Sequence, residues 1–147
     1  DAAFKTVMSE PDNIEARARM QLGAAFAGTA IENSMLGIAH SCANPLTAHY
    51  GIVHGQAVGT MLPHVITFNG EEESVASNYR ALFEGDLADR IRRHLSEAKM
   101  ALSLSDLGVE SHKVPQLAEE AANQWTAQFN PREVNSSLLL SVYEGAF

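Results

Sequence analysis

The sequence predicts an all-α protein of about seven helices. Apolar side chains recur at helical spacing in long windows, as Leu117, Ala121 and Trp125 show, and no segment has the strict alternation of a half-buried strand. Glycine, proline and asparagine separate these windows. A chain of 147 residues is long enough to bury one sizeable core. We therefore expect a single helical domain over residues 1–147.

The expected helices can be placed in order along the chain. A short helix over residues 2–8 precedes a turn at 9–13, where Asp12 or Asn13 is a good N-cap. The second helix, over 14–36, is rich in glycine and alanine in its middle, which favours a buried central helix. Pro45 should limit the continuity of the third helix. The remaining helices are expected over residues 37–49, 54–68, 71–84, 87–102, 114–129 and 134–143.

A charge-free segment runs from Asn33 to Gly70. Between Arg19 and Glu71 only Glu32 carries a charge, although 19% of all residues are charged. So long an uncharged run is rarely found on a solvated surface. We therefore expect this segment to be buried, either in the core or against a partner.

The charge-free segment holds four of the six histidines, namely His40, His49, His54 and His64. If His40 and His54 belong to successive helices, the loop between them can bring both imidazoles to one point. Zinc and Fe(II) accept imidazole nitrogen, but a site needs three or four ligands. The residue types alone leave a metal pair open and favour core histidines hydrogen-bonded to the backbone. Glu32 is a candidate for a further ligand, or for the partner of a buried polar group.

Composition and missing motifs exclude several classes of function. The formal net charge of −8 argues against nucleic acid and membrane surfaces as partners. The N-terminus lacks a signal-peptide pattern, and no apolar run reaches the length of about 18 residues that a membrane span needs. The single cysteine, Cys42, excludes an internal disulfide and favours a cytoplasmic location. No glycine-rich nucleotide loop, serine elbow, CxxC or HExxH motif is present.

A series of short motifs runs along essentially the whole chain. They include Gly37-Ile38-Ala39-His40, Asn44-Pro45-Leu46, Tyr50-Gly51-Ile52-Val53-His54-Gly55, Met61-Leu62-Pro63-His64-Val65, Phe68-Asn69, Leu107-Gly108-Val109, Val114-Pro115-Gln116-Leu117-Ala118 and Asn130-Pro131-Arg132. Together they resemble the iron-containing (group III) alcohol dehydrogenases. The small residues at positions 23–30 are similar to that family's long central helix. The histidine block is the most specific part of the resemblance.

The resemblance implies a two-domain enzyme. An N-terminal α/β domain would bind NAD or NADP, and a helical, dehydroquinate synthase-like C-terminal domain would carry the metal. The family's metal ligands are one aspartate and three histidines, and His40 and His54 match the last two histidines. The other two ligands belong to a motif that would precede Asp1. The chain would thus be most of the helical domain, as a fragment, a processed product or a cloned segment, without the nucleotide-binding domain.

The implied activity is the oxidation of a small-molecule alcohol by hydride transfer to NAD or NADP. A divalent metal, Fe or Zn, would act as the Lewis acid. The resemblance also implies an aldehyde product, a homo-oligomer and a segment that is inactive alone. The alternative is an inactive helical structural or interaction module that retains the fold. A coding region that continues upstream into a nucleotide-binding domain would favour the enzyme.

Two positions depart from the family pattern. Many members have a histidine close to the nicotinamide, four residues after the first of the two matching histidines, where this sequence has Asn44. Asparagine forms hydrogen bonds but exchanges no proton near pH 7. The resemblance therefore implies cofactor binding for Asn44 and puts a proton relay in doubt. The aromatic residue that often stands nine positions before His40 is Ile31 here, which would alter the pocket wall and the substrate preference.

Overall fold

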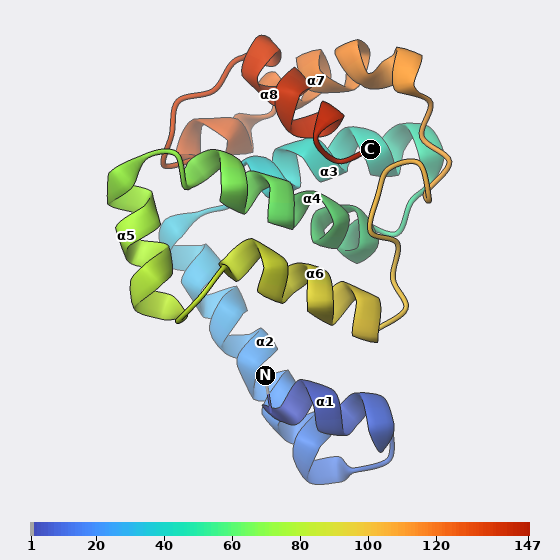
Figure 1. The fold of residues 1–147 in the computed structure, drawn as a ribbon, viewed down its shortest axis with the longest axis vertical. Coiled ribbons are helices and arrows are strands. Elements are labelled where there is room, and N and C mark those ends of the chain that lie inside the picture. Colours follow the sequence, from blue (N-terminus) through green and yellow to red (C-terminus); the bar gives the residue numbers. More distant parts are fainter. Residues whose placement is uncertain (1) are drawn as a thin grey trace. The chain divides into compact units, whose positions relative to one another are not determined.

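The computed structural model describes residues 2–147, and over that range it contains helices and no strand (Figure 1). The α-helices are α1 (Ala2–Ser9), α2 (Ile14–Ser34), α3 (Ile38–Tyr50), α4 (His54–Asn69), α5 (Glu73–Leu82), α6 (Leu87–Glu97), α7 (Val114–Ala122) and α8 (Ser136–Glu144). Two short 3₁₀ helices are η1 (Ser111–Lys113) and η2 (Trp125–Phe129). The all-α prediction is confirmed. None of the described helices is long and apolar enough to cross a membrane.

The chain forms two compact units, of which the first ends at Met35 and the second comprises Leu36–Phe147. The first unit is a pair of helices, α1 and α2, that pack on each other. The predicted turn caps α2, because the side chain of Asn13 accepts a hydrogen bond of 3.0 Å from the backbone N–H of Ala16.

Helix α2 is largely exposed in this chain. Only Ala16 is buried, whereas 54% of Leu22 and 66% of Phe26 remain accessible. The predicted burial of this helix is therefore not found within the first unit. The reason is length: α1 has 8 residues and α2 has 21, so at about 1.5 Å per residue α1 is too short to cover α2.

Helices α3 and α4 form the centre of the second unit. Helix α6 packs on α4, α7 packs on α3, α8 packs on α4, and α7 and α8 pack on each other (Figure 1). The side chains at the centre of the core are fully buried; they include Ile38, Cys42, Leu46, Met61, Leu104, Leu117, Leu139 and Tyr143. The prediction that the charge-free segment is buried is thus confirmed for the middle of α3 and for α4 from Ala57 onward, whereas the end of α3 and the start of α4, with His49 and His54, are exposed.

Helix α3 is continuous through Pro45, so the predicted limit to its continuity is wrong. A proline in a helix interior removes one hydrogen bond and costs about 3 kcal/mol. Pro45 is buried among the core residues of α3, and this packing stabilises the helix despite the missing bond. Gly51 ends α3 in the left-handed conformation, with φ of 65°, and its N–H bonds to the carbonyl of Thr47.

Two of the predicted helices end at least five residues earlier than expected. The helix expected over 114–129 ends at Ala122, because Gln124 has an extended backbone and η2 begins after it. The helix expected over 87–102 ends at Glu97, and Lys99 follows with a positive φ of 56°. After Ala122 the chain turns, and the side chain of Gln124 bonds to Asn44 of α3. After Glu97 it turns as well, and the carbonyl of Ala101 accepts a hydrogen bond from Thr60 of α4.

Candidate functional site

The turn between α3 and α4 brings two histidines close together. His40 lies in the first turn of α3, and His54 is the first residue of α4. Their ring centroids are 5.4 Å apart, and the ring planes are tilted by 45°. The left-handed Gly51 reverses the chain after α3, so the start of α4 returns toward the start of α3. The pair forms the candidate metal centre.

The surroundings of His40 favour its neutral form. Burial lowers the pKa of His40 below its usual value, and the nearby His54 lowers it further. A histidine binds a metal through the unprotonated nitrogen of its neutral ring. The electrostatics of the site are thus suited to metal binding at neutral pH.

The pair supplies only part of a metal shell. Within residues 2–147, no group of three or more histidine, cysteine or acidic side chains is arranged to hold a metal ion. Zinc and iron sites commonly use three or four protein ligands. Two imidazoles fit Fe(II) or Zn(II) as nitrogen donors, and further ligands would have to come from elsewhere. Glu32 is exposed and belongs to the first unit, so its role as a ligand stays a hypothesis.

The other two histidines of the charge-free segment have different surroundings. The Nε2 atom of His49 lies 2.7 Å from a carboxylate oxygen of Glu120 on the surface. His64 lines a cavity of about 310 Å³ between α4, α6 and α8, beside Arg92. Burial is the main cause that lowers the pKa of His64, and the positive charge of Arg92 adds to it. Neither residue belongs to the His40–His54 pair.

Asn44 lies one helical turn after His40, on the same side of α3. Its Nδ2 donates a hydrogen bond of 3.0 Å to Oε1 of Gln124, in the extended residue before η2. Close by, the hydroxyls of Ser41 and Thr126 are hydrogen-bonded at 2.8 Å in the buried interior. Two side-chain contacts therefore hold the start of η2 against α3.

The segment after η2 is held by a second set of contacts. The side-chain amides of Asn69 and Asn130 exchange hydrogen bonds of 3.1 and 2.8 Å. Arg132 donates to the carbonyl of Phe68 at 2.6 Å, and its guanidinium lies over the Phe68 ring at 4.0 Å. A Cβ atom at Gly37 would lie only 3.2 Å from Oδ1 of Asn130, so a larger residue there would press on this contact.

Comparison with known proteins identifies the family. The model of the "Fe-containing alcohol dehydrogenase family, C-terminal" matches residues 2–147. The chain belongs to this family. It is 32% identical over 146 residues to lactaldehyde reductase of Escherichia coli K12, and 30% identical over 148 residues to 1,3-propanediol dehydrogenase of Klebsiella pneumoniae. These alignments cover 90% and 92% of this chain but 38% of each relative.

Solved structures of the Fe-containing alcohol dehydrogenase family have the same fold. A 1,3-propanediol oxidoreductase superposes with a TM-score of 0.88 at 27% identity, over 98% of this chain and 41% of that chain. A sulfoacetaldehyde reductase from Bifidobacterium kashiwanohense, solved with NAD⁺, gives 0.78 at 27% identity, over 97% of this chain and 40% of that chain. The resemblance inferred from the motifs is confirmed, and the chain spans about two fifths of the length of these relatives.

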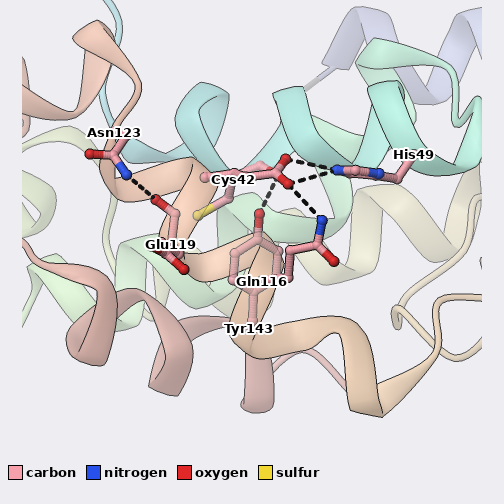
Figure 2. A network of polar contacts seen from close by, with 7 residues as sticks. Cys42, His49, Gln116, Glu119, Asn123 and Tyr143 are labelled. Carbon is pink, nitrogen blue, oxygen red and sulfur yellow. Dashed lines mark hydrogen bonds and ion pairs between the residues drawn. The ribbon is translucent and has the colours of Figure 1, made fainter.

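In this family member, a hydrogen bond from α8 also holds α3 in place. Figure 2 shows the phenol of Tyr143 against the backbone of Cys42, and its hydroxyl donates a hydrogen bond of 2.6 Å to the Cys42 carbonyl. Burial raises the pKa of the Cys42 thiol to about 12 and also raises the pKa of Tyr143. Neither group ionises at neutral pH, so both act as packing residues.

A polar network lies on the surface of α3 and α7 in the same view. Gln116 and His49 both contact the carboxylate of Glu120, at 2.9 and 2.7 Å (Figure 2). The hydrogen bond from Gln116 is the main cause that lowers the pKa of Glu120, followed by the hydrogen bond from His49. This network explains why His49 lies in the charge-free segment without being part of the metal pair.

Sequence reasoning missed the contacts made by Gln124 and Thr126. Both residues lie in the stretch expected to be one helix, and neither belongs to a recognised motif. Their partners on α3 are 80 and 85 residues away along the chain. No local pattern points to such distant pairs; only the break after Ala122 places these side chains against α3.

Proposed function

We propose that this chain is the metal-binding helical domain of an NAD(P)-dependent alcohol dehydrogenase. The observation that supports this most directly is the approach of His40 and His54, whose ring centroids lie 5.4 Å apart. By the motif resemblance, these two residues correspond to the last two histidine ligands of the family. The relatives named above are a lactaldehyde reductase and a 1,3-propanediol dehydrogenase. The substrate class we propose is therefore a small alcohol and its aldehyde.

The roles of the chain's own residues follow from the site. His40 and His54 would hold Fe(II) or Zn(II) through one ring nitrogen each, together with ligands from outside residues 2–147. When bound, the metal supplies Lewis acidity at the alcohol oxygen and the nicotinamide accepts the hydride. The buried α3 keeps His40 and Asn44 in fixed positions, because Tyr143 and Thr126 bond to it from two sides. Asn44 would contact the cofactor.

The rest of the enzyme would lie outside this chain. The chain covers 38% of its named relatives, and no glycine-rich nucleotide loop occurs in it. We propose that a nucleotide-binding domain, with the remaining metal ligands, completes the site in a cytoplasmic homo-oligomer. The second candidate function is an inactive helical module. It is favoured by Asn44, which stands where many family members have a histidine, and by the two-ligand metal pair.

The test uses the complete polypeptide in which this sequence follows its nucleotide-binding domain. Bound metal would be measured by elemental analysis, and alcohol oxidation by the formation of NADH or NADPH. We expect metal-dependent turnover that His40→Ala and His54→Ala abolish and that His49→Ala, a surface control, leaves intact. Metal-free protein without turnover on any short alcohol or diol would favour the inactive module instead.

A further inference from the structure

The cavity of about 310 Å³ between α4, α6 and α8 lies apart from the histidine pair, since neither His40 nor His54 lines it. Its wall includes His64 from α4, Arg92 from α6 and Ser141 from α8. Each of these three side chains can donate a hydrogen bond. Donors from three different helices therefore border one space.

The imidazole of His64 lies half-buried beside this cavity. Across residues 2–147, no protein group is hydrogen-bonded to either of its ring nitrogens. Gly145 lies next to the ring, and an added Cβ atom there would be 3.7 Å from Nδ1 of His64. Polar atoms that are partly withdrawn from water are usually hydrogen-bonded. The ring nitrogens of His64 are therefore left for solvent or for a ligand in the cavity.

The guanidinium of Arg92 has donors to spare. Its Nη1 lies 2.8 Å from Oδ1 of Asp89, and 40% of the Arg92 side chain remains accessible. In the part of the chain that the structure describes, this is its one hydrogen bond to a protein group. A guanidinium has five N–H donors in a planar arrangement that suits oxyanions. Most of these donors are thus available to a ligand.

The other charges around the cavity are already compensated. Glu71, just after the end of α4, lines the cavity, but its carboxylate lies 2.7 Å from Nη1 of Arg132. Helix α8 contributes no charged side chain to the wall. Burial lowers the pKa of His64, and the positive charge of Arg92 lowers it further. An anion in contact with both His64 and Arg92 would oppose both causes and favour the charged ring.

We propose that this cavity binds a small oxyanion of the phosphate or sulfate type between His64 and Arg92, and that the anion binds together with a proton on His64. The protonated ring and the unused N–H groups of Arg92 donate to the anion. The hydroxyl of Ser141 has only a long contact of 3.5 Å with the carbonyl of Ser137, so it can supply a further donor. A tetrahedral anion presents oxygens in several directions, as donors from three helices require.

The first measurement follows the histidine rings of this chain by nuclear magnetic resonance at a series of pH values, in sodium sulfate and in sodium chloride of equal ionic strength. We expect sulfate to raise the pKa of His64 and to leave that of the exposed His112 unchanged. The protonated ring should bind sulfate about tenfold more tightly than the neutral ring, because it adds one charge-assisted hydrogen bond. The same His64 titration in both salts would overturn the inference.

The second measurement compares variants by the backbone amide signal of Gly145, which lies beside His64. Titration with sulfate in mild acid gives the affinity of each variant. We expect His64→Gln and Arg92→Gln to weaken binding by about tenfold or more. Arg93→Gln is the matched control, because it removes the same charge from an exposed neighbour on α6 that does not line the cavity.

Thermal unfolding of each variant without sulfate checks that the fold is kept. Sulfate also stabilises proteins in general, but that effect is common to all variants and cancels in the comparison. Equal affinities in Arg92→Gln and Arg93→Gln would overturn the inference, because the response to sulfate would then be unspecific screening of surface charge. Both measurements need only binding to this chain, so they stand or fall independently of the proposed function.

The source of the oxyanion is distinguished by two further titrations, with inorganic phosphate and with methyl phosphate, at a mildly acidic pH where each carries one negative charge. Tighter binding of methyl phosphate would assign the cavity to a phosphate group carried by a small molecule, for which Phe68 and Val142 supply apolar wall. Equal or tighter binding of inorganic phosphate would assign it to the free ion. Binding of neither, under conditions where His64 is protonated, would overturn the inference.

Discussion

Tyr143 and Cys42 connect the last helix to the helix that carries the site, across 101 positions of sequence. The phenol of Tyr143 is fully buried and donates its proton to the Cys42 carbonyl at 2.6 Å. Cys42 lies in α3 between His40 and Asn44, so this contact fixes the stretch of helix that presents both. The position of the candidate site therefore depends on α8, although α8 contributes no side chain to the His40–His54 pair.

Tyr143→Phe should lower the free energy of unfolding by about 1–2 kcal/mol, because it removes a buried donor and leaves a carbonyl without that partner. Urea unfolding followed by circular dichroism would measure the change. Tyr79→Phe is the matched control, since within residues 2–147 the Tyr79 hydroxyl bonds to no protein group. Equal stability of both variants would show that the Tyr143 contact adds nothing to the packing.

The stability of the second unit should fall in mild acid because of His64. Burial and Arg92 lower the pKa of His64 in the folded state, so the unfolded chain takes up the proton first as pH decreases. The free energy of unfolding is then at its full value above about pH 6.5, the usual histidine pKa, and decreases between that pH and the lower folded value.

His64→Gln should flatten this pH dependence, which unfolding curves at a series of pH values would show. Some slope should remain, because the pKa of His40 is lowered as well. His112→Gln, at an exposed position, is the control. A steeper loss of stability toward acid in His64→Gln than in the wild type would contradict the argument, because it would mean that protonation of His64 stabilises the folded state.

The exposed apolar side chains of α2 should make the purified chain self-associate. Ile14 is 81% exposed and Phe26 66% exposed, and uncovered apolar patches tend to find partners. Phe26→Gln should weaken association by about tenfold or more, because burial of one phenylalanine contributes about 1.5–3 kcal/mol. Leu82→Gln, an exposed leucine in α5, should have little effect.

Analytical sedimentation over a range of concentrations would measure this association, together with the binding of a dye that recognises apolar surface. A monomer at high concentration that binds no dye would contradict it. It would mean that the small residues of α2 leave too little continuous apolar surface for a second copy.

The sequence predicted those features whose causes lie within a single element of structure. The helical spacing, the caps and the charge-free segment predicted α3 and α4 because each signal lies within the element that it describes. His40 and His54 could be paired as candidates because a turn between two helices separates them. Their approach to 5.4 Å depends on one local feature, the left-handed Gly51.

The contacts around Asn44 could not be found in this way. The break after Ala122 arises because Gln124 and Thr126 bond to α3, and a periodic pattern carries no information about such distant partners. The exposure of α2 was missed for a related reason. Glycine and alanine show that a helix can be approached closely, but not whether the covering element is part of the chain.

The isolated chain should not oxidise alcohols. Hydride transfer needs a nicotinamide held against the reacting carbon, and such positioning contributes about 7–11 kcal/mol to lowering the barrier. No segment of the sequence matches a dinucleotide-binding fingerprint. The two imidazoles should also hold a metal weakly, because stable sites use three or four ligands.

The measurement is an assay of the purified 147 residues with Fe(II) or Zn(II), NAD⁺ or NADP⁺, and a panel of primary alcohols and diols. We expect no turnover above that of His40→Ala and His54→Ala. Metal-dependent turnover that disappears in those variants would contradict the prediction, because two copies of the chain would then have to share ligands and hold the cofactor between them. A silent chain that gains activity once a nucleotide-binding domain is joined to it would instead locate the required groups outside these residues.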